Sequence, residues 1–174
     1  TSSLRASVSV NTDFAEVESD QRRGNLTRFP IRFPERRNFF LEGSNVFSFA
    51  PGLAMSPFYS RNIGLRSGQQ IPINYGGRVT GQVGQYEVGF YQLGSSDHTY
   101  LDGAGTDKLI PSEQFTVGRI KRQIFEQSTI GAIYTRRAQS PDALGESPLN
   151  AYTAGADLLF RTRNLAGRYN MDVE

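Results

Sequence analysis

The sequence predicts an all-β protein, an antiparallel meander of amphipathic strands that forms part of a transmembrane β-barrel. Apolar and polar residues alternate with a period of two in seven stretches, which indicates strands with one apolar and one polar face. Short turns alternate with long polar loops along the chain, as in outer-membrane barrels. The stretches are roughly 9 to 12 residues long, which suits strands that cross a bilayer at a tilt.

The first three predicted strands lie on both sides of a long irregular segment. In residues 4–10, leucine, alanine and valine alternate with arginine and serine. Alternation resumes at residue 77 and gives strands over 77–83 and 86–90. Between these two strands, Gly84-Gln85 is expected to form a hairpin turn.

Two further hairpins complete the pattern. The stretches FTVGRIKRQIF (115–125) and STIGAIYTRR (128–137) flank a turn at Glu126-Gln127. The last hairpin turns at about 163–164, and its apolar face is expected to contact lipid while its polar face lines the lumen. The apolar face comprises Tyr152, Leu158, Phe160, Leu165, Tyr169 and Met171, and the lumen face comprises Asp157, Arg161, Arg168 and Asp172.

Seven strands are too few for a closed single-chain barrel, since the smallest bacterial ones have about eight strands and an even number. An open edge in hydrocarbon leaves backbone groups unpaired at a cost of several kcal/mol each. Either residues 12–76 contain a further strand, or the chain is part of a larger barrel, which we favour. The alternative is a soluble sandwich in which the apolar faces form the core.

Residues 12–76 break the alternation. The stretch FPIRFPERRNFFLEGSNVFSFAPG combines phenylalanine, proline and both signs of charge, and it shows neither helical nor strand periodicity. Residues that precede proline favour extended backbone. We expect the strands and this segment to form one β-barrel-type region over residues 1–174. Within it, 12–76 would be a compact irregular segment, plug-like or facing the periplasm, with room for one short helix.

Composition excludes several classes of function. A net charge of +2, from 19 basic and 17 acidic residues, is too balanced for a nucleic-acid partner. The absence of cysteine excludes a disulfide framework, a thiolate metal site and a cysteine nucleophile. The single histidine excludes a two-histidine metal site. Because the chain opens without methionine or a signal peptide, we expect a processed chain or a piece of a longer one.

Acidic residues of the irregular segment are the candidate site. Four of them could bind Ca²⁺, which prefers several oxygen ligands, and no other cofactor is expected. Alternatively, acids and arginines of this segment form an ion-pair network in the lumen. A third interpretation is a pair of carboxylates that hydrolyses glycosidic bonds. The Ca²⁺ candidates are Asp13, Glu16, Glu18 and Asp20, and the network candidates are Glu18, Glu35, Arg37, Glu42 and Arg61.

Two other features have a structural and a functional interpretation. Ser95 or Ser96, Asp97 and His98 match a catalytic triad in composition, but neighbours in one loop seldom reach the required geometry. The phenylalanines of the irregular segment could form a sugar-stacking surface. Because tryptophan is absent, packing against the barrel wall is the better interpretation.

Two motifs of the irregular segment give a resemblance. VNTDFAEVESDQRRGNLTRFPIRFPERRNFFLEGSNVF (10–47) and PFYSRNIG (57–64) resemble a recurrent segment of large envelope proteins of the Bacteroidota and Gemmatimonadota type. These proteins usually carry an N-terminal carbohydrate-binding family 9-like domain, followed by a long β-rich region of unknown function. The resemblance implies a location in the bacterial outer membrane and a link to glycans. It implies no known reaction.

Together these observations predict an outer-membrane β-barrel protein with a structural, transport or surface-binding role. Its expected partners are outer-membrane lipid, the remaining barrel strands or other envelope subunits, and glycans. One alternative is a surface glycan-processing hydrolase that uses carboxylates in 13–42. Another is a subunit of a larger envelope assembly whose neighbours cover the open edge.

Overall fold

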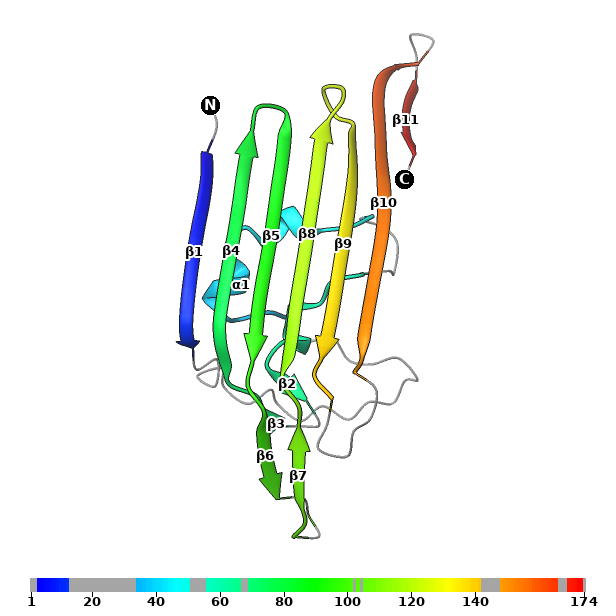
Figure 1. Cartoon of the computed structure of the whole chain (residues 1–174). Helices are drawn as coiled ribbons and strands as arrows, with labels where there is room; N and C mark the ends of the chain where they lie inside the picture. The colour runs from blue at the N-terminus through cyan, green and yellow to red at the C-terminus, as the bar shows by residue number, and fades with distance from the viewer. Residues whose placement is uncertain are drawn as a thin grey trace.

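A large antiparallel sheet organises the chain (Figure 1). The computed structural model describes residues 3–12, 34–50, 56–66, 69–101, 103, 105–141, 148–165 and 169–173. Seven strands form the sheet in the order β1-β4-β5-β8-β9-β10-β11, so that chain neighbours pair throughout. They are β1 (Ser3–Thr12), β4 (Ile73–Val83), β5 (Tyr86–Ser95), β8 (Glu113–Gln123), β9 (Thr129–Gln139), β10 (Asn150–Leu165) and β11 (Tyr169–Val173).

The predicted meander of seven strands is therefore confirmed. The sheet is open in the described part of the chain, with β1 and β11 at its two edges. The short turns lie at one end of the sheet and the long connections at the other (Figure 1). No helix among the described residues is long and apolar enough to cross a membrane.

Alternation separates the side chains of each strand onto two faces. In β4, Arg78 and Thr80 are buried while Val79 and Val83 are exposed. The strands are in register, so that residues on one face form rows across the sheet. One face of the sheet is covered by another part of the chain, and a row on this face consists of Thr80, Gly89, Arg119, Ile133 and Gly155. The chain neighbours of these residues face the opposite side of the sheet.

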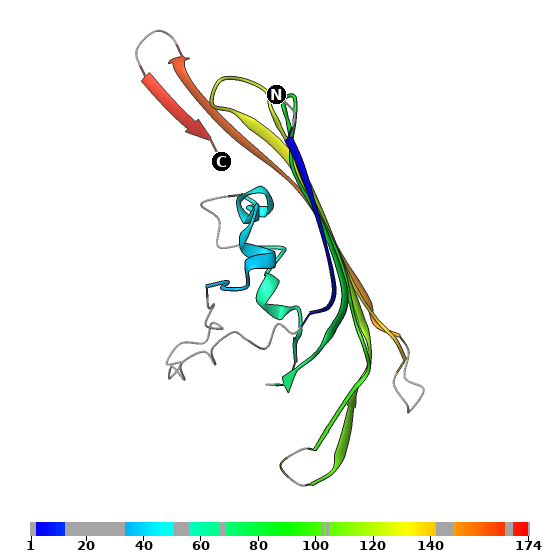
Figure 2. The ribbon, with the colours of Figure 1, turned by 90° about the vertical axis from the view of Figure 1, so that its left-hand side faces the viewer.

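The covered face is concave, and residues 34–50 and 56–66, which come between β1 and β4 in the chain, fold onto it (Figure 2). We call these residues the insert. It contains the short helix α1 (Asn38–Leu41), two 3₁₀ turns, η2 (Ser44–Phe47) and η3 (Ser60–Asn62), and the strand β2 (Leu65–Arg66), which pairs with β3 (Gln69–Gln70). The core of the protein lies between the insert and the sheet.

Several boundaries differ from those predicted. β4 begins at Ile73 rather than at residue 77. The prediction started too late because Gly76 and Gly77 lack the side chains that would reveal the alternation. The predicted polar loop after β5 contains a second hairpin, β6 (His98–Leu101) with β7 (Asp107–Ile110).

Two predicted turns also differ from the structure. The connection of β8 to β9 spans residues 124–128, which is longer than the predicted two residues. The amide of Ile124 donates to the carbonyl of Ser128 across this connection at 3.0 Å. β10 continues through Leu165, past the predicted turn at 163–164, and its pairing with β11 shifts register between Thr162 and Leu165. By contrast, the predicted two-residue turn at Gly84-Gln85 is confirmed, and Gly84 adopts the positive φ of 60° that such turns require.

Candidate functional site

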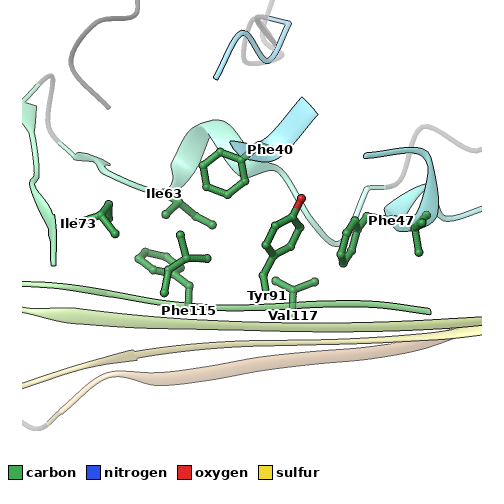
Figure 3. Close-up of a cluster of buried hydrophobic side chains, with 9 residues drawn as sticks. Phe40, Phe47, Ile63, Ile73, Tyr91, Phe115 and Val117 are labelled. Carbon is green, nitrogen blue, oxygen red and sulfur yellow. The ribbon is translucent and has the colours of Figure 1, made fainter. Parts of the chain in front are cut away.

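The contact between the insert and the concave face has an aromatic centre at Tyr91 (Figure 3). The Tyr91 side chain on β5 is fully buried, and its ring centroid lies 4.5 Å from that of Phe47 and 5.5 Å from that of Phe40. Phe58 stacks on the same ring at 5.7 Å. Rings at these distances attract one another beyond the gain from burial. The phenylalanines of the insert therefore pack against the concave face of the sheet, as the structural interpretation of the aromatic cluster expects.

Glycines of the sheet make room for this packing. A Cβ atom on Gly89 would lie 2.6 Å from Cζ of Phe47, and one on Gly155 would lie 2.8 Å from Cζ of Phe49. A Cβ on Gly76 would lie 3.4 Å from Cζ of Phe39. These positions could not be predicted from the sequence, because a glycine in a strand does not reveal which remote side chain covers it.

Arg78 on β4 joins the insert to the edge strand β1. Its side chain is 1% exposed and donates to the carbonyl oxygens of Phe39 at 2.7 Å and Glu42 at 3.1 Å. It also donates to Oγ of Ser7 on β1 at 3.0 Å, and it forms an ion pair with the Glu42 carboxylate. Arg5 on β1 forms a second ion pair with Glu42. One buried guanidinium thus connects β1, β4 and the end of α1.

A second buried ion pair crosses β9. Arg119 on β8 donates to both carboxylate oxygens of Asp157 on β10, at 2.6 and 2.8 Å. The strand between them carries Gly131 at this point, where a Cβ would lie 2.7 Å from a guanidinium nitrogen of Arg119. Asp157 also accepts the amide of Ala50 at 3.3 Å. Asp157 lies on the concave face, as the alternation within its strand predicts, and its partner was not foreseen.

A third pair, Glu35 with Arg37, folds the insert onto itself. Arg37 donates to both oxygens of the Glu35 carboxylate at 2.8 Å and to the carbonyls of Ile63 and Ser60 at 2.7 Å. Ser60 donates its hydroxyl to the same carboxylate at 2.5 Å. Burial alone would raise the pKa of Glu35, but the hydrogen bonds from Arg37 and Ser60 outweigh it and lower the pKa from 4.5 to about 2.

This lowered pKa predicts acid sensitivity. Glu35 binds its proton more weakly in the folded chain than in the unfolded chain, so its contribution is complete above pH 4.5 and is lost as the pH falls towards 2. Denaturant unfolding between pH 7 and pH 3 is expected to show a smaller loss of stability with acid for Glu35→Gln than for the unchanged chain. Identical pH profiles for the two chains would contradict the assignment.

The structure partly tests the predicted ion-pair network. Glu35 pairs with Arg37, and Glu42 pairs with Arg78 and Arg5 from the strands rather than with arginines of the insert. Arg61 is buried in the insert. The Ca²⁺ candidates Asp13, Glu16, Glu18 and Asp20 all lie outside the described residues. Within the described part of the chain, no group of three or more acidic or histidine side chains could hold a metal ion.

The Ser-Asp-His stretch takes part in strand ends rather than in a triad. Asp97 accepts the amide of Ser112 at 2.7 Å, and Ser95 Oγ accepts the amide of Glu113 at 3.0 Å. His98 opens β6 and pairs with Ile110. The contacts of Ser95 and Asp97 connect the end of β5 to the start of β8, next to the β6–β7 hairpin that His98 opens.

A cleft of about 180 Å³ opens beside the insert. Insert residues 57–63 form one wall, and residues of β8, β9 and β10 form the other. The wall on the sheet side includes Thr135, Arg137 and Thr153. The guanidinium of Arg137 holds the Glu113 carboxylate at 2.8 and 2.9 Å.

The convex face is apolar over its central part. Two successive rows across the sheet contain no charged side chain. Tyrosine and arginine occur towards both ends of this band, where Arg122 lies 5.3 Å above the ring of Tyr86 and Arg136 donates to Oδ1 of Asn150 at 2.9 Å. The two rows are Leu4, Gly81, Val88, Ile120, Ala132 and Ala156, and Ala6, Val79, Phe90, Gly118, Tyr134 and Ala154.

Comparison with protein families gives a match in the first half of the chain. A family model described as a domain of unknown function (DUF5916) matches residues 7–82, which run from β1 through the insert to the end of β4. The match includes the two motifs of the envelope-protein resemblance, while the association with a carbohydrate-binding domain stays a prediction. No curated protein and no solved structure matches the chain significantly.

Proposed function

We propose that the chain is a membrane-embedded part of a bacterial outer-membrane β-barrel and that the insert lies in its lumen. The observation that carries this proposal is the exposed apolar band on the convex face of the sheet, opposite the face that holds the core and the buried arginines. Leu4 is 57% exposed and Ile120 is 45% exposed on the convex face, whereas Arg78 and Arg119 are buried on the concave face. A sheet in water is expected to bury its apolar face, and a barrel wall in lipid is expected to expose it.

Strand length and the positions of tyrosine support the same proposal. β1, β4, β5, β8 and β9 have 10 or 11 residues each, close to the length that crosses a bilayer at a tilt. Tyr86 lies at the short-turn end of the apolar band, and Tyr75 and Tyr152 lie at the other end. Aromatic residues at both interfaces are typical of outer-membrane barrels.

In this proposal the protein has a structural, transport or surface-binding role. Its convex face contacts outer-membrane lipid, and its open edges at β1 and β11 pair with the remaining barrel strands or with other envelope subunits. An unpaired edge in hydrocarbon would cost several kcal/mol for each unsatisfied group. A glycan partner is supported only by the envelope-protein resemblance.

Folding in detergent tests the proposal directly. We expect far-UV circular dichroism of a β-protein in micelles but not in plain buffer, together with a gel mobility that changes on boiling. A soluble, monomeric β-protein in buffer would contradict the proposal. The apolar face would then have to be covered by protein instead of lipid.

A matched pair of substitutions on β8 gives a second test in lipid. Ile120→Lys lies in a charge-free row and is expected to destabilise the protein in a bilayer by about 2 kcal/mol. Gln114→Lys lies on the same face at the second residue of β8, beside Ala138 at the end of the strand, where the expected cost is at most about 1 kcal/mol. Urea unfolding from lipid vesicles measures both. Equal effects of the two lysines would indicate an exposed aqueous surface.

The hydrolase alternative draws less support from the described carboxylates. Glu35 is held by Arg37 and Ser60, and its pKa of about 2 keeps it ionised, whereas a general acid must carry a proton near neutral pH. Glu42 is engaged by two arginines, and the hydrogen bonds from Arg5 and Arg78 lower its pKa. Both residues serve to dock or fold the insert in this structure.

A further inference from the structure

The concave face changes character between β8 and β9. Under the insert, Tyr91 and Val117 are neighbours in one row and are both buried. The same row continues with Thr135 on β9 and Thr153 on β10, which are partly exposed and exposed, respectively. Hydroxyl groups contribute little to a dry packing surface and usually bind polar partners. The row therefore runs from the packed contact with the insert to a surface suited to a polar ligand.

The cleft lies at this change of character. At about 180 Å³ it is smaller than the pockets of about 300 to 1,000 Å³ that hold drug-sized ligands, so it suits a small solute. Phe58 provides an aromatic wall that its stacking on Tyr91 holds in place. Asn62 on the insert side adds an amide, and Thr135 and Thr153 add hydroxyls on the sheet side.

The charges around the cleft are compensated. Arg137 holds Glu113 through three hydrogen bonds of 2.8 to 3.3 Å, and its guanidinium lies 5.5 Å above the ring of Phe115. The next residue, Arg136, also lines the cleft, and it donates to Oδ1 of Asn150 at 2.9 Å. A ligand in the cleft therefore meets neutral donors and acceptors beside two guanidinium groups that already have partners, Glu113 for Arg137 and Asn150 for Arg136.

We propose that this cleft binds a small neutral polyol or sugar-sized solute beside the insert. Hydroxyl groups of the solute would bond to Thr135, Thr153 and Asn62, and its C–H face would lie against Phe58. The inference rests on the proposed function, since in a barrel lumen the cleft would be the solute's contact point alongside a permanently packed insert. The core at Tyr91 keeps the insert in place, so a solute would pass beside it rather than displace it.

Single cysteines test this inference, because the natural chain has none. Thr153→Cys places a thiol in the cleft, and Ala154→Cys places one at the next residue on the convex face. Thr80→Cys is the buried control under Gly43, and Gln85→Cys is the exposed control in the first turn. Each variant is reconstituted in lipid vesicles, and its rate of modification by a membrane-impermeant methanethiosulfonate reagent is measured with and without sorbitol.

The expected result is rapid modification of Thr153→Cys and slow modification of Ala154→Cys and Thr80→Cys. Sorbitol at about ten times its Kd should slow Thr153→Cys about tenfold, since roughly one-tenth of the sites then stay free. It should leave Gln85→Cys unchanged. Gluconate and N-methylglucamine, which resemble sorbitol but carry a charge, should protect Thr153→Cys much less.

The other outcomes separate the two proposals. If Ala154→Cys reacts as fast as Gln85→Cys, the convex face is in water and the proposed function fails. If Ala154→Cys is protected by lipid but Thr153→Cys does not react, the barrel stands and the cleft is closed, which overturns the inference. Reaction of Thr153→Cys without protection by sorbitol, or with equal protection by all three solutes, overturns the proposed ligand class.

Discussion

Replacing Arg78 with methionine is expected to lower the free energy of unfolding by about 3 kcal/mol or more. The Arg78 side chain is 1% exposed, and its hydrogen bonds reach Phe39, Glu42 and Ser7. Methionine fills a similar volume but donates no hydrogen bond, so all of these acceptors lose a donor at once. Because Arg78 joins β1 to the insert, both elements should become more mobile. Denaturant unfolding followed by far-UV circular dichroism measures the change.

Arg5 provides the matched control. It pairs with the same Glu42 carboxylate, but its side chain is 71% exposed. Exposed ion pairs contribute little, so Arg5→Met should cost less than about 1 kcal/mol. Similar losses of stability for the two variants would mean that the arginines stabilise the protein through the charge of Glu42 and not through the buried set of hydrogen bonds.

A valine at Gly89 is expected to disrupt the docking of the insert and to cost about 3 kcal/mol, at the upper end of the range for overpacked cores. A Cβ at this position would lie 2.6 Å from Cζ of Phe47 and 2.8 Å from Cγ1 of Val46, both of which are buried. The aromatic stack of Phe47 on Tyr91 leaves Phe47 little room to move. Limited proteolysis should therefore cut the insert faster in Gly89→Val, in addition to the loss of stability.

Gly118 is the control for the intrinsic effect of valine in a strand. It lies on the neighbouring strand β8, and a Cβ there would meet no atom within 4 Å. Gly118→Val should change stability by less than about 0.5 kcal/mol and leave the proteolysis rate of the insert unchanged. If both valines have the same effect, the Gly89 result reflects strand propensity rather than contact with the insert.

The strands and their two faces could be predicted because both depend on local periodicity. Val79 and Arg78 fall on opposite faces in the structure as the alternation predicts, and Asp157 faces inward. The hairpin β6–β7 was missed because its strands have 4 residues each and carry polar residues on both faces. Gly76 and Gly77 likewise concealed the start of β4.

The partners within the site could not be predicted, since they depend on distances between remote segments. Arg78 and Glu42 are 36 positions apart, and Arg119 and Asp157 are 38 apart with a strand between them. Composition showed that the irregular segment contains both acidic residues and arginines, and it suggested that they pair within this segment. The structure instead pairs Glu42 with residues of β1 and β4, because the insert lies across the sheet.

The position of the insert between β1 and β4 has a consequence for the order of folding. The turn of the β4–β5 hairpin has two residues, whereas 60 residues (13 to 72) separate β1 from β4. By the loop-closure relation, bringing β1 to its partner costs on the order of 3 kcal/mol more chain entropy than closing the hairpin. The hairpins from β4 onward can therefore form from nearby contacts, and β1 joins late. Since Arg78 binds both Ser7 and α1, the arrival of β1 and the seating of the insert should be one cooperative event.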